Sequence, residues 1–486
     1  MDSKRKAFLK NVLVVLFSNV VSVASGVLIG FIIPKILGVS EYGYYKTFTL
    51  YCSYIGVLHF GFLDGIYLKF AGQKYEEIDK EKFRTYTRFL FCLEGIVSLF
   101  FLLTSLLFLN TTYFLILVFV SLNIFALNIT TYFEYISQIT MKFKRMTVRN
   151  VIKCSLNIVS VVALFLLFRF NGAVIHNSIY IVIVLFINYV MAFWYVLSYR
   201  DIVFGKGSGF RKEKSVIFGF FKIGIPLLLS NLVAQLVFVV DQQFVQITFD
   251  NDTYSIYAFA YNMISLITIA TTAISIVLYP TLKTINEETI AKNYSKLNSY
   301  LLIFVAFCLI SYYPLVLIVN HFLPNYTGSL NIFVIILPGV LISSSITVIK
   351  YNCYKTFNKI KIYFIKSMIV LTLAILADVL VYLMFKTVES ISIVSIAVLF
   401  VWYILIESYF VKAFKVNWIK NLLYLVIVIG SFYGLTLIPN IYVSAISYFF
   451  VYAILTISFY FKEIKGLLKR STKKEVPPSK ESDILE

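Results

Sequence analysis

The chain has 486 residues, of which 60% are hydrophobic, 18% aromatic and only 14% charged. This composition excludes a soluble globular protein and is typical of a polytopic membrane protein. The formal net charge is +19, and in so apolar a chain we attribute it to cytoplasmic loops that meet anionic lipid headgroups. We therefore expect the lipid bilayer, and no nucleic acid, as a partner.

Long apolar runs follow one another along the whole chain. About 20 apolar residues cross the bilayer as a helix, and runs of that length bounded by charges predict transmembrane helices. They occur at 8–33, 43–63, 86–108, 113–138, 150–168, 175–198, 216–246, 255–281, 298–320, 329–349, 362–385, 391–411, 419–438 and 441–461. The predicted fold class is an all-α polytopic membrane protein with 14 transmembrane helices.

The positions of Lys and Arg test this number, because cytoplasmic loops retain positive charge. With the N-terminus inside and fourteen alternating helices, 39 of the 43 Lys and Arg fall in cytoplasmic segments. The four others are Lys35, Lys46, Arg169 and Lys386. A wrong number of helices would mix the two populations, so both termini are predicted to be cytoplasmic.

The connections between these runs are short, and the longest cytoplasmic ones are 71–85 and 199–215. The sequence contains no HExxH, P-loop, GxGxxG or Ser/His/Asp pattern, and its five cysteines form no CxxC pair. We therefore expect no catalytic, cofactor-binding or metal-binding residues. The chain is interpreted as a passive or secondary carrier without an ATP motor.

An internal repeat is visible when the chain is compared with itself at an offset of 212 residues. Without a gap, Tyr42 falls on Tyr254, Tyr45 on Tyr257 and Tyr67 on Tyr279. The pattern predicts two six-helix halves in parallel orientation, followed by two further helices. The predicted domains are an N-terminal lobe at 1–200, a C-terminal lobe at 201–412, the last two helices at 413–463 and a disordered cytoplasmic tail at 464–486.

Three stretches carry a resemblance to a known family. They are PKILGVSEYGYYKTF, FGFLDGIYLKFAGQKYEE and GIPLLLSNLVAQLVFVVDQQFV, which begin at Pro34, Phe60 and Gly224. They resemble segments of bacterial polysaccharide flippases of the Wzx type, within the multidrug/oligosaccharidyl-lipid/polysaccharide (MOP) exporter superfamily. The number of helices, the two halves and the cytoplasmic termini extend the resemblance over the entire chain.

This resemblance implies a V-shaped pair of lobes in the bacterial cytoplasmic membrane. Such a protein is expected to move undecaprenyl-diphosphate-linked oligosaccharides from the cytoplasmic to the outer leaflet by alternating access, for the synthesis of O-antigen, capsule or exopolysaccharide. Polymerase or ligase machinery would be a further partner. Two alternatives stay open: a multidrug or small-solute antiporter of the same superfamily, and a membrane polysaccharide polymerase or ligase, which the short outer loops disfavour.

Cations are the first candidates for substrate contact, because a diphosphate prefers Lys or Arg. Lys69 and Lys222 lie near the cytoplasmic ends of the second and seventh predicted helices, and Arg169 is a possible outer counterpart. Asp64 is expected to hold Lys69 in place. Each cation can instead reach lipid headgroups by snorkelling, and this alternative stays open.

Acidic residues within the predicted spans are the second group, because a charge at the bilayer centre costs about 2.5–3.5 kcal/mol and generally faces protein or water. Asp241, beside Gln242, and Asp378 are the candidates for coupling to a proton or sodium gradient. Glu134 and Glu407 lie near cytoplasmic helix ends, where they can reach headgroups and neighbouring Lys. Lys350 lies near the same boundary, where we expect contact with headgroups. The acidic residues of the spans are Asp64, Glu94, Glu134, Asp241, Asp378 and Glu407.

Overall fold

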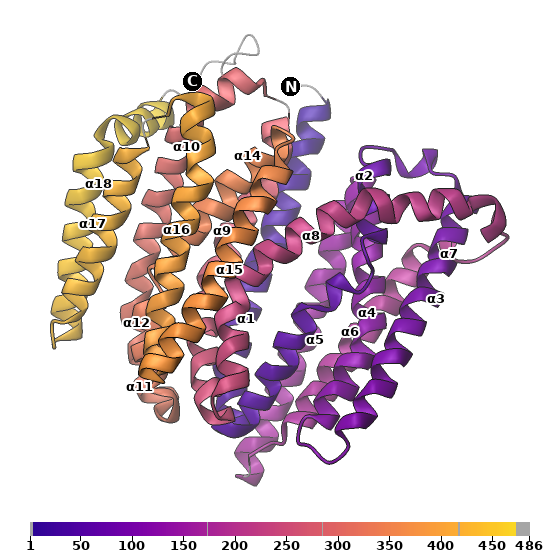
Figure 1. Cartoon of the computed structure of the whole chain (residues 1–486), viewed down its shortest axis with the longest axis horizontal. Coiled ribbons are helices and arrows are strands. Elements are labelled where there is room, and N and C mark those ends of the chain that lie inside the picture. Colours follow the sequence, from indigo (N-terminus) through magenta and orange to yellow (C-terminus); the bar gives the residue numbers. More distant parts are fainter. Residues whose placement is uncertain (1–2, 173, 284, 417, 473–486) are drawn as a thin grey trace. The chain divides into compact units, whose positions relative to one another are not determined.

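The computed structural model describes residues 3–172, 174–283, 285–416 and 418–472, and every regular element in these ranges is a helix (Figure 1). Eleven of the described helices are long and apolar enough to cross a membrane, or twelve if one bent pair forms a single span. The prediction of an all-α, multi-pass membrane protein is confirmed. The number fourteen and the cytoplasmic position of both termini stay predictions.

The first, second and eighth predicted spans differ in their boundaries from the helices of the structure. Helix α1 (Ser3–Ser53) contains the first run and the beginning of the second, 43–63, and its backbone leaves helical geometry at Gly38, with φ 70° and ψ 177°. Glycine adopts such a positive φ without a steric penalty. The eighth run lies in α9 (Asn251–Lys283). Under the 212-residue offset Gly38 falls on Asp250, where α8 (Phe210–Thr248) gives way to α9, which supports the repeat.

Contacts divide the chain into two compact units, residues 1–258 and 259–486. The first unit extends past the predicted lobe boundary at residue 200, because α8 packs closely against α2. Its remaining elements are η1 (Ile55–Val57), α2 (Phe62–Phe70), η2 (Tyr75–Glu77), α3 (Lys80–Ser105), η3 (Leu106–Phe108), α4 (Phe114–Ile139), α5 (Phe143–Asn171), α6 (Asn177–Ser198) and α7 (Arg200–Val203).

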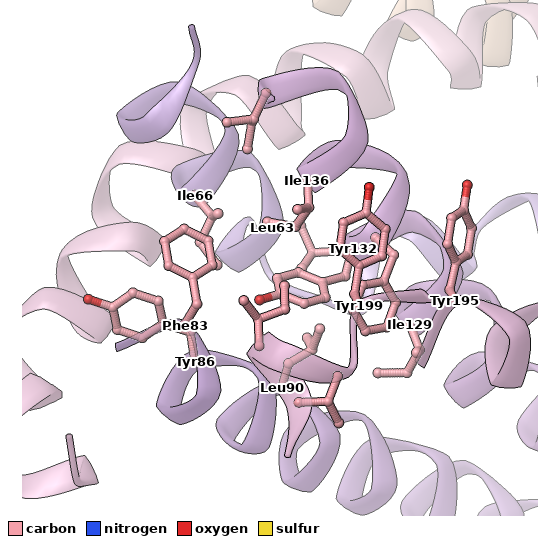
Figure 2. Packing of buried hydrophobic residues seen from close by; sticks show 14 of the residues in the cluster. Leu63, Ile66, Phe83, Tyr86, Leu90, Ile129, Tyr132, Ile136, Tyr195 and Tyr199 are labelled. Atoms are coloured by element: carbon pink, nitrogen blue, oxygen red, sulfur yellow. The ribbon is translucent and has the colours of Figure 1, made fainter. Parts of the chain in front are cut away.

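Aromatic side chains form much of the core of the first unit. Figure 2 shows Phe83 and Tyr86 of α3 near Ile66 of α2, and Tyr132 of α4 near Tyr199. These side chains are at most 1% exposed. Large aromatic rings bury much apolar area while a hydroxyl keeps a polar partner, as when the hydroxyls of Tyr132 and Thr87 bond at 2.9 Å.

Glycines allow α2 and α8 to approach each other closely. A Cβ at Gly65 would lie 2.1 Å from the carbonyl oxygen of Phe220, and one at Gly224 would lie 1.9 Å from that of Gly61. Small residues permit such close approach between helices in membranes. This crossing places Asp64 beside α8 at the start of α2.

The second unit begins within α9 and contains a bent pair of apolar helices. Its elements are α10 (Glu287–Cys308), η4 (Leu309–Ser311), α11 (Tyr312–Phe322), η5 (Pro324–Tyr326), α12 (Ser329–Ile336), α13 (Gly339–Ser344), η6 (Ser345–Lys350), α14 (Tyr351–Thr356), α15 (Ile360–Phe385), α16 (Val388–Phe414), α17 (Ile419–Thr436) and α18 (Ile441–Thr472). The axis bends by 44° between α12 and α13, where Pro338 cannot supply a backbone N–H. The following segment η6 is a π-helix.

The end of the chain departs from the predicted tail boundary. Helix α18 continues through Thr472, so residues 464–472 of the predicted tail are helical. The rest of that tail, 473–486, lies outside the described residues.

Candidate functional site

Asp64 and Lys69 lie on α2 but do not pair with each other. Asp64 is 2% exposed, and its Oδ2 lies 3.8 Å from Nε2 of His59. Lys69 is exposed, and its Nζ lies 5.2 Å from the centroid of the Phe220 ring on α8. No carboxylate in the described ranges lies within ion-pair distance of Lys69. The ammonium group is therefore available to an anionic ligand, and the role of Asp64 as its holder stays a prediction.

Two other predicted cations are exposed in the first unit. Lys222 projects from α8, two residues beyond Phe220, so the packing of α2 on α8 brings its helix beside that of Lys69. Arg169 occupies the last turn of α5, where a cation is favoured by the helix dipole. The structure brings the helices of Lys69 and Lys222 together, whereas Arg169 is on a separate helix.

Asp241 belongs to a polar cluster formed by α8, α9 and the end of α1. Its side chain is 4% exposed, and its Oδ2 accepts a 2.9 Å hydrogen bond from the hydroxyl of Tyr257. Its Oδ1 accepts the backbone N–H of Gln242 at 2.7 Å. Nearby on α8, Gln246 Oε1 accepts hydrogen bonds from Tyr51 at 3.2 Å and from Gln243 at 3.1 Å. The predicted pair Asp241 and Gln242 is thus part of an amide-rich surface on α8.

Asp378 lies in α15 of the second unit. It is 1% exposed, and its helix packs along α16. Its burial agrees with the expectation that a carboxyl far from both helix ends faces protein, while a coupling role stays a prediction.

A buried ion pair in the second unit corrects the expectation for Lys350 and Glu407. Lys350 Nζ lies 3.2 Å from Glu407 Oε2, and the two side chains are 0% and 3% exposed. Tyr294 donates to the same carboxylate oxygen at 2.8 Å, and Lys350 donates to Ser345 Oγ at 2.6 Å. Neither charge reaches the headgroups, because the tertiary structure supplies each with a partner.

The π-helix η6 positions this pair. Ser345 and Lys350 are its first and last residues, and the Lys350 ammonium also lies 3.5 Å from the centroid of the Tyr403 ring on α16. Ser345 donates to Asn298 Oδ1 of α10 at 2.5 Å. Short π-helical segments occur frequently at functional sites. The lysine at the end of an apolar run was the only sequence signal, and its partner lies 57 residues further along the chain.

Another buried carboxyl, Glu94 of α3, is fully enclosed in the first unit at 0% exposure. Its Oε2 accepts a 2.7 Å hydrogen bond from Asn128 of α4. On the same helix, Asn123 accepts from Asn188 of α6 at 3.1 Å. These side chains connect α3, α4 and α6 by hydrogen bonds. Lipid tails and apolar side chains offer no alternative partner for such polar groups.

The connection between α6 and α8 is held by an aspartate outside the membrane-spanning helices. Asp201 of α7 accepts hydrogen bonds from Lys80 and, at 2.5 Å, from the Tyr75 hydroxyl. Partial burial acts to raise the pKa of Asp201, but these two hydrogen bonds outweigh it and the pKa lies below its ordinary value. Burial and Asp201 raise the pKa of Tyr75. Arg84 donates to the Asp201 carbonyl at 2.9 Å, so the loop is fixed to α3.

Comparison with known proteins identifies the fold. No family model matches the sequence, and no curated protein matches it. Among solved structures, "Lipid II flippase MurJ, inward closed conformation" aligns with a TM-score of 0.67 at 15% identity, over 94% of this chain and 100% of that chain. The chain has a MurJ-like fold.

A second structure supports the same architecture. A MOP superfamily transporter from Pyrococcus furiosus aligns with a TM-score of 0.54 at 10% identity, over 85% of this chain and 97% of that chain. Both solved proteins are spanned almost completely. The MurJ-like fold therefore accounts for the whole helical arrangement and not for one part of it.

Proposed function

We propose that the chain is a lipid-linked oligosaccharide flippase of the MOP superfamily. Its substrate would be an undecaprenyl-diphosphate-linked repeat unit, carried from the cytoplasmic to the outer leaflet of the bacterial cytoplasmic membrane by alternating access. The observation that carries the proposal is the match to a lipid flippase over the full length of that protein. The sequence motifs that begin at Pro34, Phe60 and Gly224 support the oligosaccharide as cargo.

The exposed cations Lys69 and Lys222 supply chemistry suited to the diphosphate. They project from two helices that pack together in the first unit, and cations bind phosphate through charge-assisted hydrogen bonds. We assign them to the capture of substrate from the cytoplasmic side, and Arg169 to its release. Asp64 would orient the start of α2, while Asp241 with Gln242, and Asp378, would couple transport to an ion gradient.

Deletion of the gene tests the substrate. We expect complete lipid-linked repeat units to accumulate on the cytoplasmic face, with loss of surface polysaccharide. Normal flipping with lost chain extension would instead indicate a polymerase or ligase. Normal polysaccharide with increased drug sensitivity would indicate a multidrug antiporter, and either result would overturn the proposal.

Reconstitution tests the residues. In liposomes that contain a fluorescent lipid-linked oligosaccharide, the K69A/K222A protein should flip at least tenfold more slowly than wild type, and K69R/K222R should recover most of the rate. The matched control is K82A, because Lys82 is a half-exposed lysine that pairs with Asp79 at 3.4 Å on the same unit. Equal rates for K69A/K222A and K82A would refute the assignment of the two cations.

A further inference from the structure

Glu94 is a buried carboxyl without a cationic partner. Its side chain is 0% exposed, Oε2 accepts one hydrogen bond from Asn128, and Oε1 accepts none. No Lys, Arg or His nitrogen of the described chain lies within ion-pair distance of it. By contrast, Glu134 on α4, with 27% of its side chain exposed, pairs with Arg149 at 2.5 Å. An isolated ionised carboxylate in an apolar interior is strongly disfavoured and takes up a proton instead.

Asn128, like Glu94, has a buried oxygen that accepts no hydrogen bond. Its Nδ2 donates to Glu94 Oε2 at 2.7 Å and also contacts the carbonyl of Ile55 at 3.3 Å. Both neighbours of this nitrogen are acceptors, which supports the orientation of the amide. Its Oδ1 is buried and receives no hydrogen bond. Two neighbouring side chains thus each retain an acceptor without a donor, and a carboxylic acid would bring the hydrogen that neither now has.

The groups around Glu94 have partners of their own. Tyr86 donates to Glu213 at 2.8 Å, Tyr132 bonds Thr87 and Asn123 donates to Cys52. On the elements packed against α3 or Asn128, the titratable and charged groups with assigned partners include Lys80, Lys82, Arg84, Tyr86 and Arg88 on α3, Glu41, Tyr51 and Cys52 on α1, Asp64 on α2, Tyr132 and Glu134 on α4, Asp201 on α7, and Glu213 and Asp241 on α8. None of them lies within ion-pair distance of Glu94, so proton uptake is assigned to Glu94 itself.

We propose that Glu94 is a proton-binding site that links α3 to the end of α1. The ligand is one proton on the carboxyl group, taken from water and returned to water, with no other bond made or broken. Proton release leaves a fully buried carboxylate with one hydrogen bond from the described chain, so the site must gain a further donor by rearrangement of Asn128 or by entry of water. Asn128 holds the Ile55 carbonyl, and Gln235 of α8 donates to the carbonyl of Ser53, two residues earlier, at 2.8 Å.

The consequence for transport rests on the proposed function. A change at Asn128 alters the segment that joins α1 to η1, and Gln235 is on the same helix as Asp241. Protonation of Glu94 would therefore favour one packing of α1 and α8 over another, and a proton gradient would drive their exchange.

Infrared spectroscopy of the full chain in lipid nanodiscs tests proton binding without any transport assay. At pH 7 the wild type should show the carbonyl stretch of a protonated carboxylic acid, and E94Q should lack this part of the band. E134Q, the matched control, should retain it, because Glu134 has a cationic partner in Arg149. Identical wild-type and E94Q spectra would overturn the proposal. Wild-type protein with 13C-labelled glutamate gives the same test without a substitution, since the band should shift.

Flipping in liposomes with an imposed proton gradient tests the link to transport. E94Q, an isostere of the protonated form, should lose at least tenfold of the gradient-driven rate, whereas E134Q should lose less than twofold. An unchanged response of E94Q would overturn the link. If neither wild type nor variants flip the substrate, the proposed function fails, but the infrared result still decides whether Glu94 binds a proton.

Discussion

Removal of one partner of the Lys350–Glu407 pair should destabilise the protein strongly. The charges lie 3.2 Å apart and are almost fully buried, so K350M leaves a carboxylate with the Tyr294 hydroxyl as its remaining donor. Loss of one member of a buried pair costs about 3–5 kcal/mol, because the other charge stays buried without compensation. The K350M/E407Q protein removes both charges and should recover more than half of this loss.

Unfolding in mixed detergent micelles measures these differences in free energy. The control is K420M, because Lys420 pairs with Glu463 at 2.7 Å while 38% of the lysine side chain is exposed. Exposed pairs contribute about 0–1 kcal/mol, and Lys420–Glu463, with 38% and 18% of the side chains exposed, should cost less to break than the fully buried pair. The reasoning is refuted if K350M and K420M lose equal stability, or if the double variant is no more stable than K350M.

Three further changes follow from the first unit. G65A should prevent close packing of α2 on α8 and reduce the yield of folded protein severalfold. The control G219A, where a Cβ meets no atom within 4 Å, should leave the yield unchanged. Size-exclusion chromatography compares the two yields. D241N should lower the flipping rate at least tenfold in liposomes, and Y257F, which removes the bonded hydroxyl, should lower it less. A D241N protein that flips at the wild-type rate would contradict the coupling role of Asp241. The pKa of Asp201 is lowered on folding, so the stabilisation by its carboxylate is present above about pH 4 and is lost as the pH falls. Melting curves of D201N should lack this loss of stability at acidic pH. A D201N protein with the pH dependence of the wild type would contradict the assignment.

Local signals accounted for much of the fold. The predicted boundary after the first run is found at Gly38, where a positive φ interrupts α1. The apolar runs lie largely in helices, because the bilayer selects apolar segments of that length. The bend before Gly339 lies at Pro338, a local signal, whereas the π-helical segment packs against α10 and α16, and local residue preferences do not contain that packing.

The sequence did not predict which charged side chains contact each other in the folded chain. Lys350 and Glu407 each resemble a headgroup anchor when they are considered alone, since each lies near a helix end, and only the folded chain shows that they meet. Lys69 and His59 each lie five residues from Asp64 in the sequence, yet of these two only the His59 ring lies within 4 Å of the carboxylate in the described chain. The burial of Asp241 and Asp378 agrees with the expectation for carboxyls within spans. The contact of Glu94 with the unsatisfied amide of Asn128 joins two helices, and the sequence alone does not predict it.

The π-helix η6 also limits how the two halves of the chain can be aligned. Hydrogen bonds from i to i+5 accommodate about one more residue per turn than those of an α-helix, so the segment acts as a one-residue insertion. Under the 212-residue offset, 345–350 correspond to 133–138 in the regular helix α4. Beyond this point a gapless alignment compares side chains rotated by about 100°. An alignment built on the predicted repeat therefore needs a gap at η6.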